Sequence, residues 1–123
     1  MGRKNSPSAN KELNELIAQY ETARAENRQL YLDGDQLADI ADQYAAGRKF
    51  NEAQEVITYG LHLHPDSTDL LVEQAYLYLD TGKIPLAKKV VESITDEYDT
   101  DVKMLKAELM LNEGQLENAR NVL

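Results

Sequence analysis

The side chains best suited to bind a metal ion are two histidines, His62 and His64. Histidines that share a metal on a helix stand three or four residues apart, which places them on one face. Residues two apart on a helix point about 200° away from each other, because one turn takes 3.6 residues. We therefore interpret both as surface residues near a helix end, where the helix dipole favours histidine. We expect no metal and no cofactor.

Closely spaced carboxylates are the other candidates for chemistry. The segment Asp33-Gly34-Asp35 begins like a calcium loop but lacks the later ligands and the closing glutamate, so we expect an aspartate there to cap a helix. A pair such as Asp39 and Asp42 is typical of a solvated helix face. Catalysis needs a nucleophile with a base, a metal cluster or a phosphate-binding loop. The sequence contains none of these, and we expect a protein that is not an enzyme.

The amino-acid composition restricts the cellular compartment and the classes of partner that we expect. The 123 residues include no cysteine, which excludes disulfides and fits a reducing, cytoplasmic environment. No apolar run approaches the roughly 20 residues that span a bilayer, so we expect no membrane partner. Residues 1–32 carry 5 basic and 4 acidic side chains, whereas residues 33–123 carry 8 and 18. This acidic body repels nucleic acid; it favours a basic partner, or equally serves solubility alone.

The first part of the chain divides into a leader and a helix. We expect residues 1–10, rich in asparagine and serine, to form a disordered leader. Residues 11–32 show the spacing of an amphipathic helix, which should stop at Asp33-Gly34-Asp35. Its apolar stripe, which also carries Asn27, consists of Leu13, Leu16, Ile17, Tyr20, Ala23, Leu30 and Tyr31.

From residue 35 onward the sequence repeats, first after 34 residues and then after 32. The aligned segments are DQLADIADQYAAGRKFNEAQEVI, TDLLVEQAYLYLDTGKIPLAKKVV and TDVKMLKAELMLNEGQLENARNVL. Recurring positions are Leu37, Ala41, Tyr44, Ala53 and Ile57, then Leu71, Ala75, Tyr78, Ala87 and Val91, then Ala107, Met110, Ala119 and Leu123. Each unit is predicted to be a pair of helices that approach closely at their alanines.

Glycines and capping residues predict where these helices end. We expect Gly47, Gly82 and Gly114 to end the first helix of each unit. Gly47 comes one residue early, which predicts a longer first turn and a shorter first helix. The expected caps and stops of the other helix ends are Asn51, Pro65, Asp66 or Ser67, and Asp99 or Thr100.

At these positions the chain resembles the tetratricopeptide repeat family. The first unit matches the family pattern at Leu37, Ala41, Tyr44, Gly47, Ala53, Ile57, Gly60 and Pro65. The second unit has Asp99 where the family has proline, and the third has Lys103 and Met110 at two of the apolar positions. The chain is also similar in style to repeat proteins of gut bacteria, so we expect a bacterial origin.

The resemblance implies an all-α fold, an α-α superhelix built as a solenoid of helical hairpins. Its expected parts are repeat 1 at 34–67, repeat 2 at 68–99 and a partial repeat 3 at 100–123. Because a solenoid end needs a polar cap, we expect the chain to be the N-terminal piece of a longer repeat protein. Helix 11–32 is predicted to cap repeat 1; a coiled coil with Asn27 as its polar register residue is the alternative.

The resemblance also implies that the first helices line a concave groove for a protein or peptide. The groove residues expected here are Asp35, Ala38, Asp42 and Ala45, then Asp69, Val72, Tyr76 and Leu79, then Asp101, Met104, Glu108 and Leu111. They suit a basic or amphipathic peptide with Tyr76 as its anchor. Alternatively, further repeats cover Val72, Tyr76, Leu79 and Met104, or these residues pack between repeats. We expect a non-catalytic scaffold or adaptor, with self-association as the alternative role.

Overall fold

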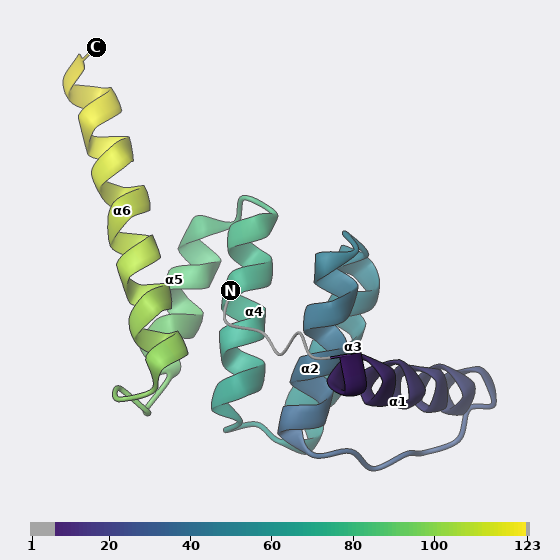
Figure 1. Ribbon diagram of the computed structural model, residues 1–123. Coiled ribbons are helices and arrows are strands. Elements are labelled where there is room, and N and C mark those ends of the chain that lie inside the picture. Colours follow the sequence, from purple (N-terminus) through teal and green to yellow (C-terminus); the bar gives the residue numbers. More distant parts are fainter. Residues whose placement is uncertain (1–6, 123) are drawn as a thin grey trace.

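The computed structural model describes residues 7–122, with the side chains of residues 11–114. Its helices are α1 (Pro7–Ala25), α2 (Gly34–Ala46), α3 (Phe50–Leu63), α4 (Thr68–Asp80), α5 (Ile84–Ser93) and α6 (Thr100–Val122). No strand occurs among these residues. Helices α2 and α3 form one hairpin, α4 and α5 form the next, and α6 continues the series (Figure 1). The fold is therefore the all-α hairpin solenoid that the sequence predicts.

Small residues let the two helices of each hairpin touch. The alanines Ala41 and Ala53 of the first hairpin and Ala75 and Ala87 of the second are at most 1% exposed. Without long side chains between them, helix axes can approach to about 8 Å. Gly60 has the same effect where α3 meets the next repeat, because a Cβ there would stand 2.8 Å from Leu70 Cδ1.

Gly60 therefore offers a direct test of the packing between repeats. Gly60→Val should lower the free energy of unfolding by about 2 kcal/mol, because added atoms in a closed core force neighbours to move. Thr58→Val is the matched control, since it introduces the same side chain at an exposed position of the same helix. Urea unfolding followed by circular dichroism measures both, and equal losses would contradict close packing at Gly60.

The two interhelical turns have the same length, which corrects the prediction made from Gly47. Lys49 N donates to Tyr44 O at 2.8 Å, and Lys83 N donates to Tyr78 O at 2.7 Å, so both turns close identically. The left-handed residue of the second turn is Gly82, with a φ of 77°, and its counterpart in the first turn is Arg48, with a φ of 61°. Gly47 therefore stands one residue before the left-handed position of the first turn, and Arg48 occupies that position instead.

Substitutions in the turns should change stability in opposite directions. A left-handed conformation costs a residue with a Cβ about 1–2 kcal/mol. Arg48→Gly should therefore raise the free energy of unfolding by about 1 kcal/mol, and Gly82→Ala should lower it by a similar amount. Gly47→Ala is the control, because its φ is −85° and a Cβ there makes ordinary contacts. Destabilisation by Arg48→Gly in thermal unfolding would refute the assignment.

Helix α1 differs at both ends from the predicted helix 11–32. It begins at Pro7, so residues 7–10 are helical rather than part of a leader; residues 1–6 lie outside the described part. It ends after Ala25, because Asn27 adopts a left-handed conformation with a φ of 53° and Arg28 N donates to Ala23 O at 2.8 Å. Asn27 thus terminates the helix, as asparagine can do in place of glycine.

The stretch after α1, residues 28–33, forms an extended strap that joins α1 to α2. Tyr59 donates its hydroxyl to Leu30 O at 3.0 Å, and His64 Nε2 lies 2.8 Å from Leu32 O. The side chain of Leu32 is buried, and Asp33 accepts from Gln36 N to cap α2. His64 is therefore a structural residue that holds the strap, not only a surface histidine near a helix end.

Helix α1 packs across the first hairpin through its buried Tyr20 and Ala23 (Figure 1). Tyr44 of α2 donates its hydroxyl to Glu21 of α1. Burial, and then this bond to a carboxylate, raises the pKa of Tyr44 above that of free tyrosine. Within the described residues no helix combines the length and apolar character needed to cross a membrane.

The remaining helix ends follow the expected caps in part. Ser67 accepts from Leu70 N at 3.3 Å to cap α4, and Asp99 accepts from Asp101 N at 2.9 Å to cap α6. Asn51 does not cap α3, which begins one residue before it without a side-chain cap. Gly114 does not end the first helix of repeat 3, because α6 continues to Val122. One glycine inside a helix costs only about 1 kcal/mol, which neighbouring helix formers can offset.

Candidate functional site

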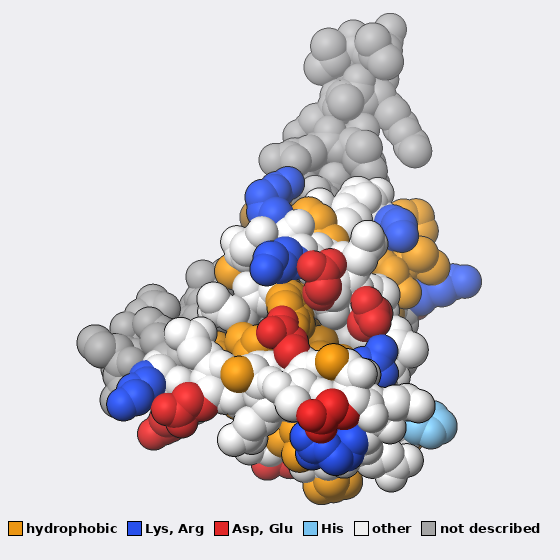
Figure 2. Space-filling model, turned by 90° about the vertical axis from the view of Figure 1, so that its right-hand side faces the viewer, with side chains coloured by type: hydrophobic (Ala, Val, Ile, Leu, Met, Phe, Trp, Pro, Cys, Tyr) orange, Lys and Arg blue, Asp and Glu red, His pale blue; other side chains and the backbone are white. Residues whose placement is uncertain are grey.

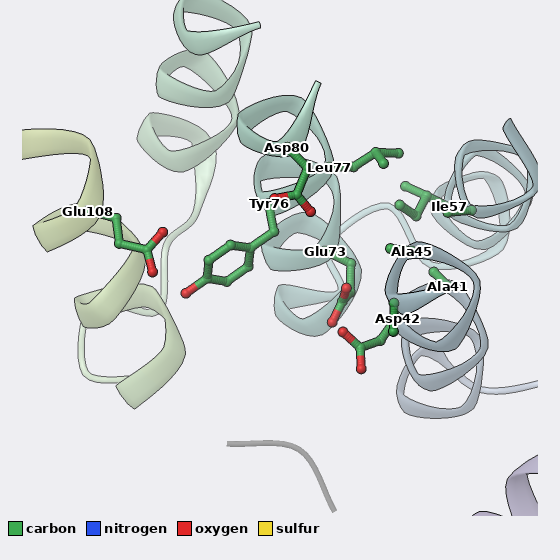
Figure 3. A pocket seen from close by; sticks show the side chains of 11 residues that line it. Ala41, Asp42, Ala45, Ile57, Glu73, Tyr76, Leu77, Asp80 and Glu108 are labelled. Atoms are coloured by element: carbon green, nitrogen blue, oxygen red, sulfur yellow. The ribbon is translucent and has the colours of Figure 1, made fainter. Parts of the chain in front are cut away.

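A cleft of about 400 Å³ opens between α2, α4 and α6 (Figure 3). Alanines of α2 and α3 form its floor, and longer side chains from α4 and α6 form its walls. The lining residues are Ala41, Asp42, Ala45, Ala46, Ala53, Ile57, Glu73, Tyr76, Leu77, Asp80 and Glu108. The cleft exists because the hairpins stack with their first helices on the same side.

The polar lining of the cleft is acidic. Its charged residues are Asp42, Glu73, Asp80 and Glu108, and no basic side chain is among the described lining residues. Asp42 and Glu73 point toward each other, and Glu108 extends from α6 toward the ring of Tyr76 (Figure 3). Desolvation raises the pKa of the Asp80 carboxyl; Arg48 opposes this rise and Asp42 adds to it. Negative charge is thus concentrated where the surface is concave.

The predicted groove residues occupy several different environments. Asp42, Ala45, Tyr76 and Glu108 line the cleft. Ala38 and Val72 are buried between helices, and Leu79 is partly buried against the core shared by α4, α5 and α6. Tyr76 is itself 9% exposed, so only part of its ring borders the cleft. Met104 and Leu111 are exposed on α6, away from the lining.

Sequence reasoning missed two of the lining carboxylates, Glu73 and Asp80. Both stand four residues after a predicted groove residue of the same helix, Asp69 and Tyr76 respectively. Residues four apart share a helix face, so the periodicity contained the signal. The prediction assigned only one residue per helical turn to the groove, so it omitted Glu73 and Asp80.

The remaining predicted acidic residues form a separate row at the N-terminal ends of the first helices. Asp35, Asp69 and Asp101 belong to the first turns of α2, α4 and α6, with Asp99 just before α6. A hydrogen bond to Asp35, desolvation and the negative charges of Asp35, Asp99 and Asp101 raise the pKa of Asp69 to about 7. Within the described residues no group of carboxylates or histidines is arranged to hold a metal ion.

The surface at the α1 end has a different character. In Figure 2, which views that end, acidic and basic side chains are interspersed with hydrophobic ones. Among the described side chains of this part, residues 11–32 contribute 3 basic and 4 acidic ones. The excess of negative charge therefore belongs to the repeats and not to the capping helix.

A comparison of the sequence with models of known families agrees with this architecture. The model of the tetratricopeptide repeat matches residues 44–109, which is more than half of the chain. The chain belongs to the tetratricopeptide repeat family. Comparisons with curated proteins and with solved structures gave no match. Tetratricopeptide repeats generally mediate interactions between proteins and are typically non-catalytic scaffolds.

The acidic row makes the stability of this tetratricopeptide repeat protein depend on pH. The pKa of Asp69 is raised in the folded state, so the folded state binds more protons than the unfolded state between about pH 4 and 7. Stability from this residue is present below that range and is lost as the pH rises through about 7. Asp69→Asn should therefore raise the melting temperature at pH 8, by a few degrees, and change it little at pH 4.

The control for this effect is Asp66→Asn, which removes one charge at an exposed position of the preceding turn. Its change in melting temperature should be small and equal at both pH values. Scanning calorimetry of the three proteins measures the difference. An Asp69→Asn effect that is the same at pH 4 and pH 8 would contradict repulsion within the acidic row.

Proposed function

We propose that this protein is a non-catalytic adaptor that captures a basic, amphipathic peptide segment of a partner in the cleft between α2, α4 and α6. The observation that carries the proposal is the set of four carboxylates contributed by three successive first helices, Asp42, Glu73, Asp80 and Glu108. A concave site lined by one sign of charge concentrates the field there and attracts a ligand of the opposite sign.

The floor of the cleft supports an amphipathic ligand rather than a purely charged one. Ala45 and Ala46 give the cleft accessible apolar surface. Its base is closed by side chains that are at most 4% exposed, namely Ala41, Ala53, Ile57 and Leu77. A lysine or arginine of the ligand can lay its aliphatic stem on this floor while its charged group reaches a carboxylate. Contacts between such a group and a carboxylate are charge-assisted and stronger than neutral hydrogen bonds.

Neutralising the cleft should weaken the capture of a basic peptide. The test variant is Asp42→Asn, Asp80→Asn and Glu108→Gln together, and the probe is a short fluorescein-labelled peptide of lysine and leucine in helical spacing. Loss of three charges should reduce affinity about tenfold or more and flatten its dependence on salt. Fluorescence anisotropy at low and at physiological salt measures both.

The matched control carries the same loss of charge outside the cleft, as Glu12→Gln, Glu15→Gln and Glu97→Gln, all at exposed positions. This control should bind the probe like the original protein. An acidic peptide of the same length should not bind. Equal losses in the two triple variants would show that binding follows net charge alone, and the cleft would then not be the site.

A further inference from the structure

The position that turns the chain in the first two repeats stays helical in the third. Arg48, Gly82 and Gly114 are equivalent in the repeat register, since each stands four residues after Tyr44, Tyr78 or Met110. The first two have positive φ and end their helices, whereas Gly114 lies inside α6. In repeat 3, the segments that correspond to the two helices of a hairpin therefore form one continuous helix, α6.

Opening the hairpin leaves a face of α6 without its second helix. In repeats 1 and 2 the equivalent alanines, Ala41 and Ala75, are covered by α3 and α5 and are at most 1% exposed. Their counterpart Ala107 is exposed. Met110 is 71% exposed, whereas its counterpart Tyr44 is 7% exposed. On this face Ala107 and Met110 are apolar side chains without a covering second helix, and Lys103 is a charged side chain nearer the start of α6.

The segment whose sequence fits this face is residues 115–122. Leu116, Ala119 and Val122 repeat the positions of Phe50, Ala53 and Val56, which begin the second helix of repeat 1. The straight course of α6 carries this segment past the ends of α4 and α5, away from the hairpins of its own chain (Figure 1).

We propose that two copies of this chain pair by exchanging residues 115–122. Each α6 supplies the second helix of the partner's repeat 3, so the two helices lie antiparallel and cross at Gly114. The exchange is isologous, because each copy gives and receives the same surfaces. No atom comes within 4 Å of a Cβ built on Gly114, so the crossing point is open to the partner's helix.

This pairing uses a different face of α6 from the cleft. Glu108 borders the cleft and Ala107 and Met110 do not; they stand about 100° and 160° around the helix from Glu108, given 3.6 residues per turn. Peptide capture and dimer formation are therefore separable, and failure of either leaves the other intact.

Light scattering across a wide concentration range and cysteine cross-linking test the exchange together. The chain has no cysteine, so Ala107→Cys with Ala119→Cys introduces a defined pair. Mild oxidation should give a covalent dimer on a non-reducing gel, because each cysteine meets the other copy. A covalent monomer would show that residues 115–122 fold back within one chain, and a concentration-independent monomer without cross-links would also overturn the exchange.

Two single substitutions locate the interface. Met110→Glu should shift the protein to monomer, whereas Tyr31→Glu, the same kind of change at an exposed position of the strap far from α6, should leave the dimer unchanged. Gly114→Ala should retain the dimer or strengthen it about fivefold, because alanine favours a straight helix over glycine. A dimer that survives Met110→Glu, or one that dissociates with Gly114→Ala, would contradict a straight helix shared between copies.

Discussion

The close contact between paired helices at small side chains is the constraint on which the rest of the structure depends. Ala41, Ala53, Ala75 and Ala87 are enclosed because nothing larger separates the helices that carry them. Tight hairpins bring the first helices of successive repeats to one side, and larger residues would spread them apart. The cleft between α2, α4 and α6 is thus a consequence of alanines that pack between the helices.

Negative charge has two physical roles on these first helices. In the first turns, Asp35, Asp69 and Asp101 suit the positive ends of the helix dipoles, but stacking brings the carboxyls together and makes Asp69 hard to ionise. Further along, the cleft carboxylates face a concave space that can receive a positively charged group. The same solenoid geometry therefore produces repulsion between carboxyls at one end and a concentration of negative charge along the cleft.

Much of the fold could be predicted because periodicity and small residues are local signals. The hairpins and the apolar stripes follow from spacing, and Ser67 and Asp99, which cap α4 and α6, were each one of two candidates that the sequence offered. The end of α1 at Asn27 and the left-handed Arg48 could not be predicted, since both residues adopt conformations that usually indicate glycine. The strap was missed because its partners, Tyr59 and His64, lie in a helix far along the chain. For the cleft, the resemblance to the repeat family indicated Asp42, Tyr76 and Glu108, but not how deeply Val72 and Ala38 would be buried.

The strap also sets an order in which the chain can fold. The turns join residues five apart, such as Tyr44 and Lys49, whereas the strap contacts join residues 29 and 32 apart. Closing a longer loop costs more chain entropy before any contact is made. The acceptors Leu30 O and Leu32 O, moreover, meet side chains that are in place only once α3 has formed. We therefore expect helix α1 to dock onto a first hairpin that is already built, so that exchange of its amide protons reveals opening events that leave the first repeat intact.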